Sequence, residues 1–203
     1  MRFLIFMSAF VLLSCGQNSS NENKEKTKTD TVKVPAGTAK AIVKDEMSAY
    51  ISPGEGNVNE SMKAKYGNKW HVLNDKEAQC MKDVFDYFIA PKRKENPDYP
   101  YITKGDFNGD GKTDTAAVVT DDDKKDFRIA ILSGPGKIEL WEEDVLINAA
   151  LSTVPKGTIE GGDIDHPKKI KMKGDGINVE YFEQASFVIY WNGSSFKRIQ
   201  AGD

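Results

Sequence analysis

The chain is poor in the side chains that most often perform catalysis or bind transition metals, with two cysteines and two histidines among 203 residues. Two thiols are too few for a cysteine-based zinc site. The sequence contains no nucleophile elbow and no phosphate-binding glycine loop. His71 lies in a strand-like run, residues 69–73, and we interpret it as a structural residue. These absences favour a non-catalytic protein, with a small hydrolase as the alternative.

The apolar run at the start of the chain, Phe3–Leu13, is too short to span a bilayer as a stable helix. It follows the single charge of Arg2, an arrangement typical of a signal peptide. It ends in the stretch LLSC, residues 12–15, which resembles the lipobox of bacterial lipoproteins. The resemblance implies cleavage by signal peptidase II after residues 1–14 and a diacylglycerol on Cys15. The alternative is an ordinary secretory signal with an unrelated cysteine.

The next segment, residues 16–40, contains almost no aliphatic side chains and no aromatic ones. Such a segment cannot bury enough apolar surface to offset the entropy lost on ordering, so we expect a disordered tether. A coil of this length would hold a domain about 28 Å from its anchor. Gly16 stands where lipoproteins retained in the inner membrane carry an aspartate. The resemblance therefore implies the outer membrane of a Gram-negative cell.

The charge balance is acidic, with 31 acidic and 28 basic residues and a formal net charge of −3. Arg2 leaves with the signal peptide and the tether has two more lysines than acids, so residues 41–203 carry −6. An acidic domain gains no counterion-release energy from nucleic acid. We therefore expect no nucleic-acid partner. The expected partners are the membrane, through the lipid on Cys15, and an envelope protein or glycan.

Cys80 has no intramolecular partner if Cys15 is acylated. We interpret Cys80 as a small buried hydrophobe. An intermolecular disulfide or a reactive thiol is the alternative.

Periodicity predicts one clear helix and eight candidate strands. Residues 74–89 carry apolar side chains at helical spacing, Asn74 and Glu77 have capping-box spacing, and Pro91 marks the expected end. We expect one face of this helix to pack on a sheet, with a ligand groove as the alternative. From residue 99 on, the candidate strands are YPYIT, TAAVVT, FRIAIL, KIELWE, KKIKMK, INVEYF, SFVIYW and SFKRIQ.

Two dipeptides, Asp175-Gly176 and Asn192-Gly193, predict hairpin turns between neighbouring strands. We therefore expect a single α+β domain over residues 41–203. It should contain a mainly antiparallel β sheet or partly open barrel of six to eight strands, with one packed helix. A domain of this length can bury one full core.

One loop, GDFNGDGKTD at residues 105–114, crowds three aspartates and an asparagine together. Asp106, Asn108, Asp110 and Asp114 occupy positions 1, 3, 5 and 9 of the loop, so their side chains converge when the loop curls. The backbone carbonyl of Lys112, at position 7, would supply another oxygen. Convergent oxygen ligands suit Ca²⁺ better than Mg²⁺. The sequence therefore predicts structural calcium within residues 106–114.

The loop is not an EF-hand, because position 12 is Ala117 rather than glutamate and a strand-like run follows. It resembles the DxNxDGxxD calcium loop of FG-GAP and VCBS-type repeats over about residues 104–120. In those repeats the loop joins two strands and binds calcium. A single copy cannot form the propeller of that family. The alternative is a metal-free turn in which Asp and Asn side chains bond nearby backbone amides.

A second acidic cluster contains Asp163, Asp165 and His166, which could bind a transition metal or form a turn closed by Pro167. The whole chain resembles small bacterial lipoproteins with a single calcium loop. We therefore expect a membrane-anchored envelope lipoprotein with a calcium-stabilised, non-catalytic binding domain. A periplasmic inhibitor or immunity protein, or a small hydrolase, is the alternative.

Overall fold

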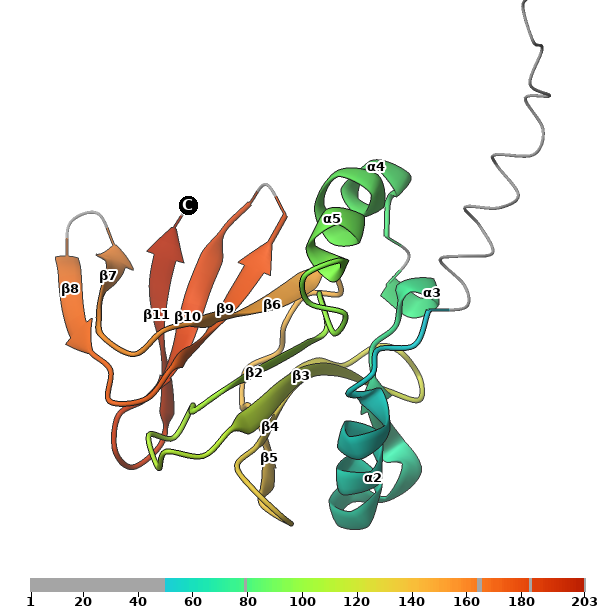
Figure 1. Ribbon diagram of the computed structural model, residues 1–203, viewed down its shortest axis with the longest axis horizontal. Coiled ribbons are helices and arrows are strands. Elements are labelled where there is room, and N and C mark those ends of the chain that lie inside the picture. Colours follow the sequence, from blue (N-terminus) through green and yellow to red (C-terminus); the bar gives the residue numbers. More distant parts are fainter. Residues whose placement is uncertain (1–49, 79, 164–165, 183, 203) are drawn as a thin grey trace, which may run out of the picture. The chain divides into compact units, whose positions relative to one another are not determined.

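Antiparallel strands form most of the structure, with short helices beside them (Figure 1). The computed structural model describes residues 50–78, 80–163, 166–182 and 184–202. The expected signal peptide, the lipidated Cys15 and the tether lie outside these residues. The α+β class is confirmed. The described residues contain eleven strands rather than six to eight, and the sheets are open and do not close into a barrel.

The first sheet is built around β3 (Asp114–Asp121). One edge of β3 pairs with β4 (Phe127–Leu132), which in turn pairs with β5 (Ile138–Leu140). The other edge is shared by β2 (Ile102–Gly105), near the start of β3, and β1 (Trp70–Val72), near its end. The pairing of both edges satisfies the backbone of β3, and its apolar middle is fully buried because those side chains pack in the core.

The second sheet has the order β11-β10-β9-β6 and is antiparallel throughout. Its strands are β6 (Ala149–Val154), β9 (Gly176–Tyr181), β10 (Ser186–Trp191) and β11 (Phe196–Gly202). The turn at Asn192-Gly193 joins β10 and β11, which confirms that hairpin.

A separate two-stranded ladder consists of β7 (Thr158–Asp163) and β8 (His166–Lys171). The hairpin expected at Asp175-Gly176 is wrong. β8 pairs with β7, whereas β9 pairs with β6 and β10. The Asp-Gly pair therefore links two different sheets, and local turn chemistry could not reveal which strands it joins.

Residues from the first two sheets meet in one core, which also includes the buried side of a helix, α2 (Glu55–Tyr66). The sequence did not predict α2. Pro53, Gly54 and Gly56 predict a loop, and α2 buries only Val58 and Met62. An apolar face of two residues is too short to give a clear helical period. The larger core side chains include Val58, Met62, Val72, Ile102, Phe107, Ile129, Ile131, Leu151, Ile177 and Ile189.

The single helix predicted over residues 74–89 is wrong in its boundaries. The chain forms α3 (Asp75–Ala78), leaves helical geometry at Cys80 and Met81, and then forms α4 (Lys82–Val84). A π-helical turn, η2 (Phe85–Ile89), and α5 (Ala90–Arg93) follow. Pro91 does not end the helix. It lies in the first turn of α5, where the missing N–H of proline is tolerated.

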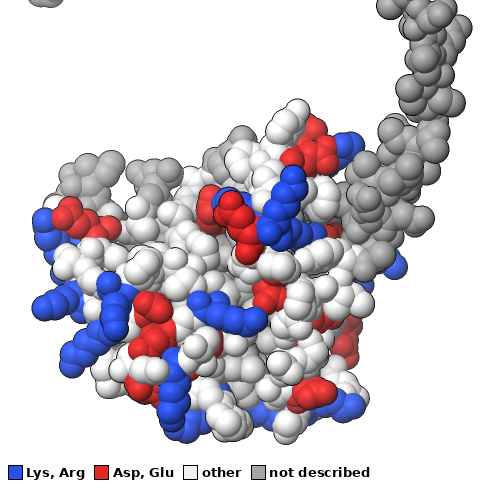
Figure 2. Space-filling model, in the orientation of Figure 1, with Lys and Arg blue, Asp and Glu red and all other residues white. Residues whose placement is uncertain are grey.

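Within the described ranges, no helix is long and apolar enough to cross a membrane. On the face drawn in Figure 2, Lys and Arg side chains predominate along the left edge, where Figure 1 places β8, and are interspersed with Asp and Glu side chains elsewhere.

Candidate functional site

The acidic loop connects β2 to β3 as a hairpin, and Gly105 pairs with Asp114 at its base. Phe107, which lies between two of the expected ligands, is fully buried and anchors the loop to the core. Gly111 has a φ of +83°, a conformation that glycine adopts at little cost. The loop is followed by the strand β3, whereas an EF-hand loop is followed by a helix, so the loop is not an EF-hand.

Side chains of the loop accept hydrogen bonds from its own backbone. Asp110 N donates to Asn108 Oδ1 at 2.8 Å, and Gly111 N donates to Asp106 Oδ2 at 3.0 Å. Asn108 N donates to Asp114 Oδ2 at 3.2 Å. These are the Asx-type bonds of the metal-free alternative. They engage one carboxylate oxygen each of Asp106 and Asp114, which leaves a second oxygen on both residues, and they engage the single amide oxygen of Asn108.

Two carboxylates of the loop are withdrawn from solvent to different extents, since Asp106 is half-buried and Asp114 is buried. Asp106 Oδ1 is inaccessible to solvent and has no hydrogen-bond partner among the described residues. Asp114 is 1% exposed. Burial, together with the nearby charges of Asp110 and Asp106, raises the pKa of Asp114. A buried carboxylate oxygen without a partner is costly, and a bound cation would remove that cost.

Asp175 ties the loop to the second sheet. Asp106 N donates to Asp175 Oδ2 at 2.9 Å, and Asp175 N donates to the carbonyl oxygen of Asp106 at 2.7 Å. Lys156 N donates to the other oxygen of Asp175 at 2.9 Å. The contact is so close that a Cβ on Gly174 would lie 2.4 Å from the Asp106 carbonyl oxygen.

Sequence reasoning missed Asp175 as part of this site. Its one signal is the Asp-Gly dipeptide, which predicts a turn and cannot reveal a partner 69 residues away. The loop therefore lies at the junction of the two sheets.

The donor types suit a hard cation. The expected convergence of the three loop aspartates is not seen, because no three or more His, Cys, Asp or Glu side chains in the described ranges are arranged to hold a metal ion. Calcium also binds amide and backbone carbonyl oxygens, so the arrangement of acidic side chains alone does not determine whether the loop binds calcium. Asp106, Asn108, Asp110, Asp114 and the carbonyl of Lys112 all lie on this loop, next to the unpaired Oδ1 of Asp106. Calcium at this loop stays a proposal.

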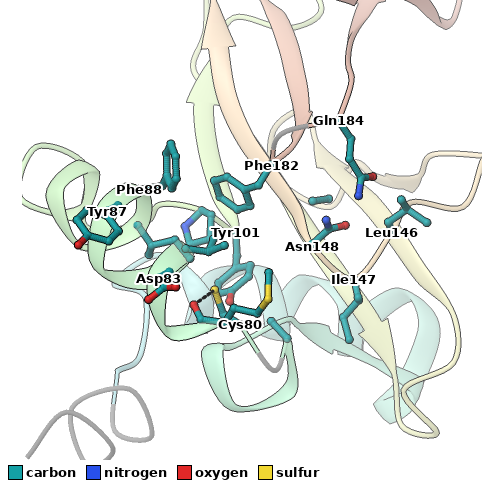
Figure 3. A pocket seen from close by; sticks show the side chains of 16 residues that line it. Cys80, Asp83, Tyr87, Phe88, Tyr101, Leu146, Ile147, Asn148, Phe182 and Gln184 are labelled. Carbon is teal, nitrogen blue, oxygen red and sulfur yellow. Dashed lines mark hydrogen bonds between the residues drawn. The ribbon is translucent and has the colours of Figure 1, made fainter. Parts of the chain in front are cut away.

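A second candidate site is an apolar pocket of about 850 Å³ between the helical segments and the start of β6 (Figure 3). The helical wall carries Met81, Val84, Tyr87, Phe88 and Ile89. The opposite wall carries Leu146, Ile147, Ala149 and Phe182. The two walls meet where the ring centroids of Phe88 and Phe182 are 5.7 Å apart.

The expectation that the helical stripe is a core face holds in part. Ile89 is buried and packs with Tyr99 and Ala150. Phe88, which belongs to the same apolar stripe, is 39% exposed and lines the pocket. The break at residues 80–81 separates the stripe into two helical segments, so its side chains do not all reach the sheet.

A buried network of Asp75, Arg93 and Tyr101 lies beside the pocket. Arg93 donates through both terminal nitrogens to the two carboxylate oxygens of Asp75, each at 2.6 Å. Tyr101, which lines the pocket, donates its hydroxyl to Asp75 Oδ1 at 3.0 Å. Burial, followed by the negative charge of Asp75, raises the pKa of Tyr101. Tyr101 is therefore a fixed neutral donor in the wall.

Cys80 also lines the pocket and is half-buried rather than fully buried as expected. Its thiol contacts the carbonyl oxygen of Met81 at 3.5 Å and forms no disulfide. Burial raises the pKa of Cys80, so its thiol stays protonated at neutral pH and is a weak nucleophile.

The two histidines lie apart from both sites. His71 Nε2 is 3.0 Å from Glu77 Oε1, and His71 Nδ1 is 3.9 Å from Asp122 Oδ1. These contacts connect β1, α3 and the β3–β4 loop. His166 is exposed and pairs with Asp163 in the last rung of the β7–β8 ladder, while Asp165 lies outside the described residues.

The chain matches no protein-family model, no curated protein and no solved structure. Its functional interpretation therefore depends on its own fold and on the geometry of the acidic loop and the apolar pocket.

Proposed function

We propose that this chain is a lipid-anchored envelope protein whose α+β domain is a non-catalytic binding module stabilised by calcium. The observation that carries the binding role is the apolar pocket. Its described lining contains no histidine, serine or threonine, and Asp83 is its one formally charged residue at neutral pH. Concave sites lined mainly by apolar and aromatic side chains, with a few polar groups, are typical of ligand-binding pockets.

The lipid anchor is supported by the sequence at residues 12–15, where the small residue and Cys15 follow the apolar run in lipobox register. In this proposal residues 16–40 form the tether and residues 41–203 the binding domain. The Gly16 that follows the anchor favours the outer membrane.

Calcium is supported by the buried, unpaired Oδ1 of Asp106 and by the buried carboxylate of Asp114. A bound cation would neutralise both groups and would fix the hairpin loop against Asp175. Its role in this proposal is structural, because none of the loop residues 105–114 lines the apolar pocket.

The pocket is tested with a neutral solvatochromic dye added to the full chain. Dye fluorescence should saturate with one dye per protein. Met81→Glu and Leu146→Glu, on opposite walls, should each weaken binding at least tenfold, because a carboxylate in an apolar site must be desolvated. Ile51→Glu is the matched control, since Ile51 and Met81 are both 72% exposed and Ile51 does not line the pocket.

Equal dye binding by all three variants would show that the pocket is not the binding site. The hydrolase alternative has a separate test. Substrate turnover by the full chain that disappears in His71→Ala would show that the non-catalytic interpretation is wrong.

A further inference from the structure

We propose that the apolar pocket holds an acyl chain of a lipid from the surrounding membrane. This inference rests on the proposed function of the pocket as a binding site and adds the chemical class of the ligand.

Exposed apolar side chains are concentrated at the pocket. Six large hydrophobic residues are conspicuously exposed among the described residues, and five of them line it. These five are Met81, Tyr87, Phe88, Leu146 and Ile147. Scattered apolar residues on a surface need no explanation, but a contiguous exposed group marks an interaction site.

The charge of the lining determines which part of a ligand can enter. No lysine, arginine or histidine is among the described lining residues, and the single carboxylate is Asp83. A ligand with a buried anionic group would have no cationic partner and would meet the charge of Asp83. The side-chain amides of Asn148 and Gln184, on the wall opposite the helices, can bond a neutral ester or hydroxyl group (Figure 3).

A hydrocarbon chain fits this lining better than a peptide does. Each peptide residue brings a backbone N–H and C=O that must be hydrogen-bonded when buried. The lining offers few neutral polar side chains for them, because Tyr101 is already bonded to Asp75 and the others are the hydroxyl of Tyr87 and the amides of Asn148 and Gln184. An acyl chain brings no polar groups into the apolar part. The volume of about 850 Å³ also lies within the range of small-molecule sites.

The membrane is the favoured source of the chain. In the proposed function the domain is tethered at a membrane surface, where acyl chains are the abundant apolar ligand. If the acyl groups on Cys15 occupied the pocket themselves, they would no longer hold the protein in the bilayer.

Cys80 provides a direct readout of occupancy because it lines the pocket. The mature full chain is treated with N-ethylmaleimide, and peptide mass spectrometry follows alkylation at Cys80. Octyl, decyl and dodecyl maltoside, each below its micelle concentration, are the probes. Protection of Cys80 should require less maltoside as the chain lengthens, with affinity rising up to about fourfold for each added methylene.

At saturation, dodecyl maltoside should slow alkylation of Cys80 about tenfold or more and displace the dye, while maltose should do neither. Leu146→Glu should lose this protection, whereas Ile51→Glu should keep it. Protection that is independent of chain length, or protection by trileucine but not by the maltosides, would overturn the proposal.

Two further results separate this inference from the proposed function. If the dye binds in the pocket and the maltosides do not displace it, the acyl ligand is wrong and the binding module stands. If neither binds, both are wrong. If Cys80 of the lipidated chain stays protected after non-covalently bound lipid has been extracted, and becomes accessible once the acyl groups on Cys15 are removed chemically, the chain's own lipid fills the pocket, and the membrane source is wrong.

Discussion

Asp75 and Arg93 form the most deeply buried ion pair among the described residues, with side chains 1% and 8% exposed. The pair connects α3 to α5 across the break in the helical segment. Arg93 Nε also donates to the carbonyl oxygen of Tyr99 at 2.7 Å. A protein with such a pair need not be more stable than one with apolar residues at both positions. Removing only one partner, however, leaves a buried charge without a counterion.

Asp75→Ala should therefore lower the free energy of unfolding by about 3–5 kcal/mol, measured by urea denaturation of the full chain. Replacing both partners with apolar residues, as in Asp75→Leu with Arg93→Met, should recover much of this loss. The control is Glu160→Ala, because Glu160 pairs with Lys169 and both side chains are about two-thirds exposed or more. That substitution should cost at most about 1 kcal/mol. If Asp75→Ala and Glu160→Ala lowered the free energy of unfolding equally, the explanation by an unpaired buried charge would be wrong.

At the scale of residues, the sequence predicted groups of residues that are close in the chain, but it did not predict contacts between residues that are far apart in the chain. The loop residues Asp106, Asn108, Asp110 and Asp114 could be grouped from sequence because all lie within one loop. Two contacts could not be predicted from the sequence, because they depend on how separate elements pack. These are the contact of Asp106 with Asp175 and that of Asp75 with Arg93.

At the scale of elements, alternating apolar side chains were a reliable guide to strands. A strand overlaps each of the eight stretches predicted from residue 99 on, although β2 begins only at Ile102, and another strand lies at residues 70–72. The alternation is weak in β6 and β7, which were not predicted. β6 begins with two alanines, and β7 contains Gly161 and Gly162. Small residues carry little of the apolar contrast on which the prediction depends.

The β2–β3 hairpin is the element that calcium should stabilise. Extracellular calcium modules often bind at about 10⁻⁴–10⁻³ M. At tenfold excess over that dissociation constant, binding adds about 1.4 kcal/mol to the free energy of unfolding, or about 3–6 °C in Tm. Melting curves with calcium and with chelator measure this shift.

Asp110→Ala removes a proposed ligand and should abolish the shift in Tm. Asp122→Ala, an exposed acid in the neighbouring β3–β4 loop, should leave it intact. Identical wild-type curves in calcium and chelator, with no calcium found by elemental analysis, would reduce the loop to an ordinary Asx-type turn.

The same shift should depend on pH through Asp114, whose pKa is raised chiefly by burial. A carboxyl with a higher pKa in the folded chain contributes stability below its unfolded pKa and loses that contribution as pH rises through the folded pKa. The chelated protein is therefore penalised at neutral pH by the ionised Asp114. Calcium binds the ionised form, so the calcium-dependent shift should shrink as pH falls through the raised pKa.

At the scale of the whole molecule, the proposals assign different tasks to different parts of the chain. The residues before 41 would determine where the domain is held, the acidic loop would fix the junction of two sheets, and the pocket would bind the ligand. The anchor can be separated experimentally from the other two parts, because Cys15 lies outside the sequence that forms either site.

Cys15→Ala should abolish acylation and leave an unprocessed or mis-sorted precursor, because the lipobox interpretation requires the thiol as the site of lipid attachment. Mass spectrometry of the wild-type chain should show a diacylglycerol on Cys15, and membrane fractionation should place the protein with the outer membrane. Cys80→Ala is the matched control and should be processed and localised like the wild type, since the chain contains no other cysteine. Wild-type protein that is free of lipid would show that residues 12–15 are the end of an ordinary secretory signal.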